Sequence, residues 1–119
     1  MRTIYIAGPY TLGDVAVNVR TALDAAEACL AAGLAPYVPH LSHFWHLVYP
    51  HPVETWLALD AVWLAHCGAV LRLPGVSRGA DLECAQAYAL GIPVFFVLAD
   101  ALAWGQEKTL TAQDPIVPW

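Results

Sequence analysis

Short apolar runs alternate along this chain with longer segments of helical periodicity. Four runs of four to six residues are rich in β-branched, aromatic or aliphatic side chains and lie next to glycine or proline, which predicts strands. Between them, apolar positions recur every three or four residues and the segments end at glycine, which predicts helices. The predicted strands are residues 3–7, 35–38, 69–73 and 93–98, and the predicted helices are residues 15–32, 54–67 and 79–90.

The order of these elements predicts the fold. Strands that alternate with helices form a parallel sheet with right-handed crossovers. The strands are mostly apolar and do not alternate with polar residues, as a sheet covered on both faces requires. We therefore expect residues 1–119 to form one domain, a three-layer α/β sandwich with a flavodoxin-like (Rossmann-like) parallel sheet of four or five strands. Residues 40–53 are expected to be a long loop with at most one helical turn, and residues 99–119 a short helix and a tail.

Composition narrows the class of protein. Hydrophobic residues make up 59% of the chain and charged residues 13%, yet no apolar stretch is long enough to predict a membrane span, and no secretory signal is indicated. The three cysteines lack paired spacing, which fits free thiols in a reducing cytoplasm. The apolar excess predicts a homo-oligomer, a dimer or larger. A net charge of −5 argues against duplex nucleic acid as a partner.

A turn rich in small residues follows the third predicted strand. Its candidate ligand-binding residues are Gly75, Ser77, Arg78 and Gly79. Glycines let a ligand approach the backbone, and the free N–H groups at a helix start favour anions. Serine and arginine side chains bind phosphates or ribose hydroxyls. Glu83 is expected in the first turn of the helix that follows. The alternative interpretation is a capped turn with an ordinary glutamate that interacts with the helix dipole.

Two carboxylates lie in apolar surroundings. Glu83 lies about one helical turn beyond Gly79, near the end of an apolar strand, and Asp60 is the only charge between Glu54 and Arg72. A buried carboxylate is costly, and perturbed carboxylates gather at functional sites. Both are therefore candidate catalytic groups. The alternatives are a surface glutamate and an aspartate that is the one solvent-facing residue of its helix.

Further candidates follow the first two predicted strands. They are Gly8, Pro9 and Tyr10 after the first strand, and His40, His43 and His46 after the second. The carboxyl ends of parallel strands meet where α/β proteins bind ligands. The phenol of Tyr10 is placed to hydrogen-bond a carboxylate or simply to pack, and the histidines to line the site or to pack. A metal on all three histidines is disfavoured, because a spacing of three and six residues spreads them around a regular helix.

Four segments, in their order and spacing, carry a resemblance to a known family. They are Ile4-Tyr5-Ile6-Ala7-Gly8-Pro9-Tyr10, Pro39-His40-Leu41, Asp60-x-x-Trp63-Leu64 and Ser77-x-Gly79-x-x-x-Glu83. From about Ile4 to Phe96 the chain resembles the nucleoside 2-deoxyribosyltransferase-like superfamily. That superfamily includes a small uncharacterised bacterial and phage branch and the 2′-deoxynucleoside 5′-monophosphate N-glycosidases.

The resemblance implies roles for individual residues. Glu83 matches the nucleophile at C1′ of the deoxyribose, and Asp60 the aspartate that assists at the base. Tyr10 lies near the tyrosine that orients the nucleophile. Ser77 and Gly79 match the loop that holds the 5′ end of the sugar. No metal or organic cofactor is implied. Two departures are Gly68, where family members often carry an acid, and a tail that offers only Gln106 and Gln113 as amide side chains.

These observations lead to one leading hypothesis and two alternatives. The leading hypothesis is cleavage or transfer at the N-glycosidic bond of a nucleoside or nucleoside monophosphate, through Glu83 and a covalent glycosyl-enzyme intermediate. We expect Glu83 to be ionised at neutral pH, with help from Tyr10, and Asp60 to be pushed toward its neutral form. The alternatives are a non-catalytic nucleotide- or sugar-binding module and, more weakly, a metal-dependent hydrolase built on the three histidines.

Overall fold

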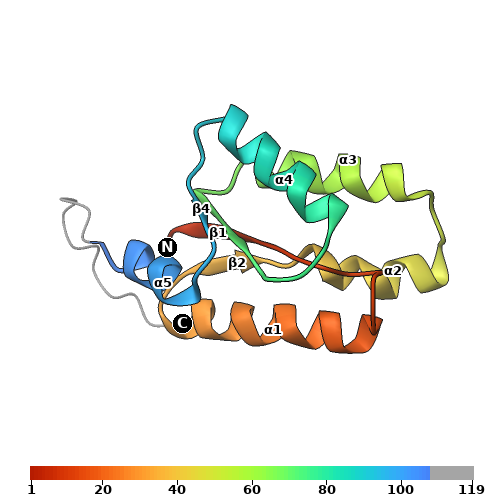
Figure 1. The fold of residues 1–119 in the computed structure, drawn as a ribbon, viewed down its shortest axis with the longest axis horizontal. Helices are drawn as coiled ribbons and strands as arrows, with labels where there is room; N and C mark the ends of the chain where they lie inside the picture. The colour runs from red at the N-terminus through yellow and green to blue at the C-terminus, as the bar shows by residue number, and fades with distance from the viewer. Residues whose placement is uncertain (108–119) are drawn as a thin grey trace, which may run out of the picture.

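The computed structural model describes residues 1–107, which form a sheet with helices on both faces (Figure 1). The elements in chain order are β1 (Thr3–Ala7), α1 (Val15–Ala31), β2 (Ala35–Tyr37), the 3-10 helix η1 (Pro39–Leu41), α2 (Ser42–Val48), α3 (Val53–Leu64), β3 (Ala69–Arg72), α4 (Arg78–Ala89), β4 (Val94–Phe95) and α5 (Leu98–Gly105). The predicted tail beyond residue 107, with Gln113, lies outside the described residues.

All strand pairings in the four-stranded sheet are parallel, and the strand order is β2-β1-β3-β4. This confirms the predicted flavodoxin-like α/β fold. After β1, the chain adds β2 on one side of β1 and then crosses over to add β3 and β4 on the other side. The direction in which strands are added therefore reverses between β1 and β3. Ligands of such sheets bind in the crevice outside the carboxyl ends of the strands at this point.

The two faces of the sheet pack against different helices (Figure 1). Successive side chains of a strand point to opposite faces. Ile4 and Ile6 of β1 therefore join Leu71 of β3 in a core under α1 and α5. Tyr5 and Ala7 of the same strand join Val70 in a second core with residues of α3 and α4. Within the described residues, no helix is both long and apolar enough to cross a bilayer.

Three of the differences from the sequence prediction have a physical explanation. The segment expected to be a loop from residue 40 contains η1 and the seven-residue α2. Because α2 has neither a side-chain cap nor a buried residue, the sequence shows little of the hydrophobic periodicity that would predict a helix there. β4 covers two residues instead of six, because Val97 is the N-cap of α5. α4 begins at Arg78, so Glu83 lies in its second turn and Asp81 is the acidic residue of the first.

Candidate active site

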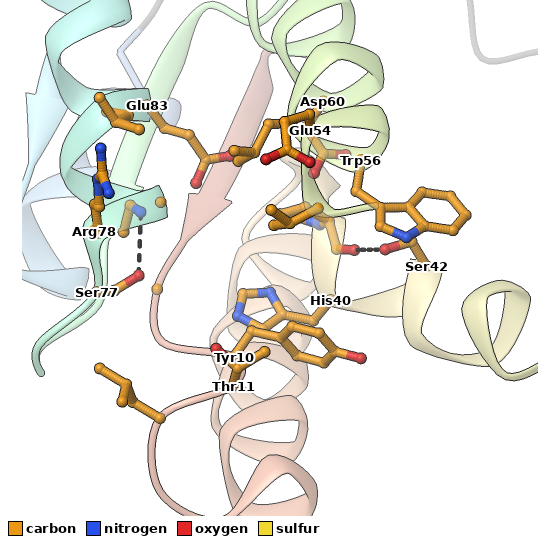
Figure 2. Close-up of a pocket in the computed structure, with 18 of the residues that line it drawn as sticks. Tyr10, Thr11, His40, Ser42, Glu54, Trp56, Asp60, Ser77, Arg78 and Glu83 are labelled. Atoms are coloured by element: carbon orange, nitrogen blue, oxygen red, sulfur yellow. Dashed lines mark hydrogen bonds between the residues drawn. The ribbon is translucent and has the colours of Figure 1, made fainter. Parts of the chain in front are cut away.

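A cleft of about 660 Å³ opens at the carboxyl edge of the sheet. It lies beside the reversal of strand order, between the loop after β1 and the start of α4, with η1, α2 and α3 completing the walls. Figure 2 shows Glu83 and Asp60 on one side of this cleft and His40 with Tyr10 on the other. Of the residues predicted from sequence, Gly8, Tyr10, His40, Asp60, Ser77, Arg78, Gly79 and Glu83 line it.

Glu83 of α4 is half-buried above the middle of β1. The hydroxyl of Tyr5, a fully buried side chain of that strand, donates a hydrogen bond to its Oε2. The expectation that Tyr10 supplies this phenol is wrong, because the Tyr10 hydroxyl contacts Nδ1 of His43 instead. Burial raises the pKa of Glu83 to about 8, whereas a donor on the carboxylate favours the ionised form. Tyr5 therefore opposes the effect of burial.

Asp60 of α3 also accepts a hydrogen bond from a tyrosine of the sheet. Its side chain is buried, and the Tyr37 hydroxyl donates to its Oδ1 over 3.3 Å. Burial raises the pKa of Asp60 to about 6, and the Tyr37 hydrogen bond acts in the opposite direction. Burial and the neighbouring Asp60 raise the pKa of Tyr37 to about 12, so the phenol stays protonated and keeps its role as a donor.

The side chains of Tyr5 and Tyr37 pack against each other on one face of the sheet. Tyr5 and Tyr37 are register partners in β1 and β2, and their rings stack at 5.5 Å with an interplanar angle of 27°. Trp63 stacks on Tyr37 at 5.9 Å. The packing fixes both hydroxyls relative to the strands, so each carboxylate is positioned by the sheet as well as by its own helix.

The expected order of the two carboxyl pKa values is wrong. Glu83 was expected to ionise first, with help from the start of its helix, but the structure raises its pKa above that of Asp60. A position in the second turn explains part of this, because the helix dipole acts within the first turn. With these pKa values, the two carboxyls together hold one proton between about pH 6 and 8.

The turn after β3 is shaped by packing against the loop after β1. Gly75 has φ +112°, and a Cβ there would lie 2.8 Å from Cγ of Pro9. Neither residue lines the cleft, contrary to the prediction for both. Ser77 caps α4, since its hydroxyl accepts from the Ala80 N–H over 3.1 Å. Gly79 lines the cleft, and its missing side chain leaves space beside Leu57.

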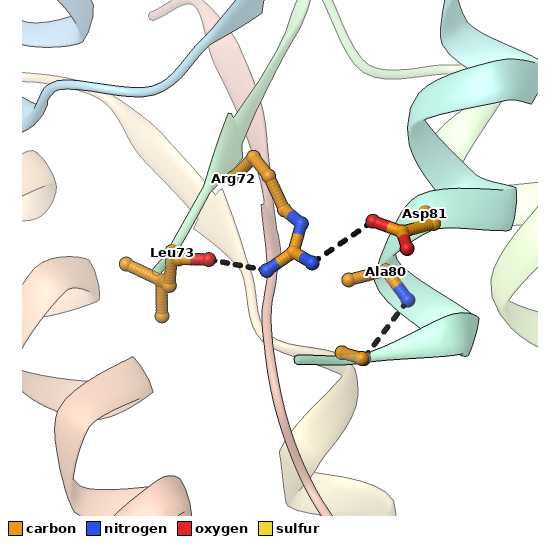
Figure 3. A network of polar contacts seen from close by, with 5 residues as sticks. Arg72, Leu73, Ala80 and Asp81 are labelled. Atoms are coloured by element: carbon orange, nitrogen blue, oxygen red, sulfur yellow. Dashed lines mark hydrogen bonds and ion pairs between the residues drawn. The ribbon is translucent and has the colours of Figure 1, made fainter. Parts of the chain in front are cut away.

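A buried arginine connects the end of β3 to α4 (Figure 3). Arg72 places Nη2 2.9 Å from Oδ1 of Asp81 in the first turn of α4, and its Nη1 donates to the carbonyl oxygen of Leu73. The guanidinium therefore links the first turn of α4 to the end of β3. Glu83 lies two residues beyond Asp81 on the same helix.

The loop after β1 is held by Asn18 of α1. Its Nδ2 donates to the carbonyl oxygens of Tyr10 over 3.0 Å and of Leu12 over 2.7 Å. Asp14 caps the helix by accepting from the Val17 N–H. This loop presents the Tyr10 ring to the cleft.

The three histidines have separate partners. His40 places Nε2 3.0 Å from the carbonyl oxygen of Pro9. His43 bonds the Tyr10 hydroxyl and lines a groove against α1 instead of the cleft. His46 lines the cleft, and its Nδ1 accepts from Nε1 of Trp56 over 2.8 Å and from the backbone N–H of His51 over 3.2 Å. Among residues 1–107, no three His, Cys, Asp or Glu side chains are placed so that they could hold one metal ion. The geometry therefore gives the metal hypothesis no support.

Sequence reasoning missed residues that line the cleft, Trp56 and His51, and residues that hydrogen-bond its carboxyls, Tyr5 and Tyr37. The two tyrosines and Trp56 were not singled out, because aromatic residues in strands and helices are usually part of the core. A usable signal existed for Tyr5: it is a phenol in the middle of a fully apolar strand, and a buried phenol needs a hydrogen-bond partner.

The comparisons with known proteins place the chain in a family. The model of a family described as "Domain of unknown function (DUF7768)" matches residues 2–97. The chain belongs to this family. The DUF7768 description names no activity, so the geometry of the cleft carries the functional argument.

A solved structure similar to this DUF7768 chain is a 2-deoxyribosyltransferase from the psychrotolerant bacterium Bacillus psychrosaccharolyticus. The match has a TM-score of 0.60 and 17% identity, and covers 77% of this chain and 69% of that one. At this identity the likeness shows a shared fold. A search of curated proteins finds no match.

Proposed function

We propose that this protein cleaves the N-glycosidic bond of a deoxyribonucleoside or its monophosphate, with Glu83 as the nucleophile. The observation that carries the proposal is the pair of carboxyls in one cleft, each held by a phenol from the sheet. Paired carboxyls of unequal pKa are the machinery of glycosidic cleavage. The fold shared with a 2-deoxyribosyltransferase supports the same chemistry.

The chemistry takes two steps. In the first, a carboxylate oxygen of Glu83 attacks C1′, the bond from C1′ to the base nitrogen breaks, and its electron pair leaves with the base. Asp60 in its protonated form gives a proton to the departing base. In the second step, a water or a second base attacks C1′ and breaks the ester to Glu83, and its proton passes to the Asp60 carboxylate. The configuration at C1′ is retained.

The walls of the cleft suit different parts of such a substrate. Trp56, Leu57 and the Tyr10 ring provide apolar surface for a flat base. The turn at the start of α4, with Arg78 and the small residue Gly79, suits the hydroxyl or phosphate at the 5′ end. The deoxyribose then lies between these walls, with C1′ at Glu83.

One observation favours a second candidate, a non-catalytic nucleotide- or sugar-binding module. A carboxyl with a pKa of about 8 is mostly protonated at pH 7 and serves as a hydrogen-bond donor instead of a nucleophile. The two candidates differ in whether the Tyr5 hydrogen bond and a bound substrate bring Glu83 into its ionised form.

Product analysis separates the two candidates. Purified protein is incubated at pH 7 with the four common 2′-deoxynucleosides and their monophosphates, and free base is followed by chromatography. Release of base that disappears in Glu83→Gln and persists in Glu27→Gln, which alters an exposed glutamate of α1, supports the enzyme. Tight binding without base release, unchanged in Glu83→Gln, supports the module and contradicts the proposal. Mass spectrometry of the intact protein during turnover tests for the deoxyribosyl ester.

We also infer a homo-oligomer in which a second copy covers α2. Phe44, Trp45 and Leu47 of this helix are each more than half exposed. Contiguous apolar surface of this kind marks interaction sites. Light scattering at micromolar concentration tests the inference, and a purely monomeric species contradicts it.

A further inference from the structure

The hydrogen bonding of His40 fixes which of its ring nitrogens carries a proton. Nε2 lies 3.0 Å from the carbonyl oxygen of Pro9, and a carbonyl only accepts, so Nε2 must carry the hydrogen. Burial lowers the pKa of His40 and outweighs the backbone groups of Pro9 and Gly8, which act in the opposite direction, so the ring is neutral with a single N–H. Nδ1 is therefore a bare lone pair that acts as an acceptor.

This acceptor has no partner. The His40 side chain is 4% exposed, and its Nδ1 is buried without a hydrogen bond to any part of residues 1–107. The Tyr10 ring packs edge-on against the His40 ring at 6.2 Å, but its hydroxyl is engaged with His43. An unpaired buried acceptor is costly, and most such atoms in native proteins are paired. His40 lines the cleft, so a ligand whose donor displaces the side chains that cover Nδ1 relieves this cost.

The position of His40 indicates which part of the ligand supplies the donor. Figure 2 shows the ring beside Tyr10 and away from Ser77 and Arg78. If C1′ sits at Glu83 and the 5′ end at the start of α4, the base faces His40.

We propose that His40 determines base specificity, by accepting a hydrogen bond at Nδ1 from an exocyclic amine of the base. This inference rests on the proposed function, because it takes the ligand to be a nucleoside. The cleft then prefers a base with an amine over the same base without it. A site built to pair a donor rejects the analogue that lacks it, because its own polar group is left unpaired.

A matched pair of ligands tests the preference on the native protein. Carbocyclic 2′-deoxyadenosine and its analogue without the 6-amine lack a glycosidic bond and are not cleaved, so calorimetry reports the Kd of each. We expect the amine to tighten binding by about tenfold or more, the effect of one buried hydrogen bond. Equal Kd values for the two ligands overturn the inference and leave the proposed function standing. Failure of the protein to bind either ligand counts against both.

Two substitutions separate the acceptor from the structural hydrogen bond. His40→Gln brings an amide N–H to the position of Nε2, so it retains the bond to Pro9, but it has no acceptor at the position of Nδ1. His40→Asn does the reverse, with its Oδ1 at the position of Nδ1. We expect the amine preference to vanish in His40→Gln and to survive in His40→Asn, with melting curves confirming that both fold. A preference that persists in folded His40→Gln, or that vanishes equally in both variants, overturns the assignment.

Discussion

The two faces of the sheet are built from alternate residues of the same strands, yet they differ in chemistry. Toward α1 and α5, β1 presents Ile4 and Ile6, and the core there is hydrocarbon. Toward α3 and α4, the strands present the phenols of Tyr5 and Tyr37 and the guanidinium of Arg72. The pleat thus lets a five-residue strand stabilise the fold on one face and position polar groups on the other.

The face toward α3 and α4 makes stability depend on pH. Glu83 and Asp60 have raised pKa values in the folded state, so folding favours their protonated forms. Their contribution to stability is fully present below the unfolded values, 4.5 and 3.8, and is lost as pH rises through about 8 and about 6. The core toward α1 and α5 contains no carboxyl, and burial raises the pKa of its one titratable side chain, Cys29, so that thiol stays neutral over the same pH range. Four substitutions test the contrast.

The largest expected effect is that of Glu83→Gln. Loss of the nucleophile reduces base release on the order of 10⁴-fold or more. The same change raises the free energy of unfolding at pH 9 by about a few kcal/mol, because an ionised buried carboxyl is removed, and changes it little at pH 4. Urea unfolding at both pH values measures this. Glu27→Gln is the matched control, and equal stabilisation by both variants contradicts the assignment.

On the opposite face, Ile6→Ala acts on stability alone. The side chain is fully buried, so the substitution lowers the free energy of unfolding by about 2–5 kcal/mol. Thermal or urea unfolding measures this loss. The kcat of the folded fraction and the shape of the pH profile should not change. A shifted pH profile in Ile6→Ala means that the two faces are coupled.

Tyr5→Phe removes the donor on Glu83 and keeps the ring. Loss of a hydrogen bond to a charged group reduces kcat/KM by about 10- to 100-fold. Activity needs one proton on the carboxyl pair, so the rate follows a bell with limbs near pH 6 and 8. Without the phenol the pKa of Glu83 rises further, and the alkaline limb moves to higher pH. An unchanged alkaline limb in the pH–rate profile contradicts the role of Tyr5.

Much of this molecule is predictable from its sequence. Apolar runs and the rule for parallel sheets predicted the strands, and the topology brought Glu83 and Asp60 to one cleft. The phenols on these carboxylates were not found, because Tyr5 and Tyr37 match an apolar pattern and only the register of β1 and β2 shows that their rings stack. The order of the pKa values was wrong because it depends on burial, which spacing along the chain does not reveal.

The smallest effect expected is that of Tyr37→Phe. Its hydrogen bond to Asp60 is long, at 3.3 Å, so kcat/KM should fall only a fewfold, by roughly the 0.5–1.5 kcal/mol of an ordinary hydrogen bond. The ring still stacks between Tyr5 and Trp63, so the midpoint of thermal unfolding should change little. The Tyr37 bond lowers the pKa of Asp60, so its loss raises that pKa and moves the acid limb of the bell to higher pH.

The two phenol variants should therefore move opposite limbs of the same pH–rate profile, Tyr5→Phe the alkaline limb and Tyr37→Phe the acid limb. This is a sharper test than either rate alone, because a general loosening of the cleft reduces the rate without separating the limbs. Movement of both limbs in both variants would show that the carboxyls respond to either phenol as one coupled group. The pairing of each carboxyl with its own strand would then be wrong.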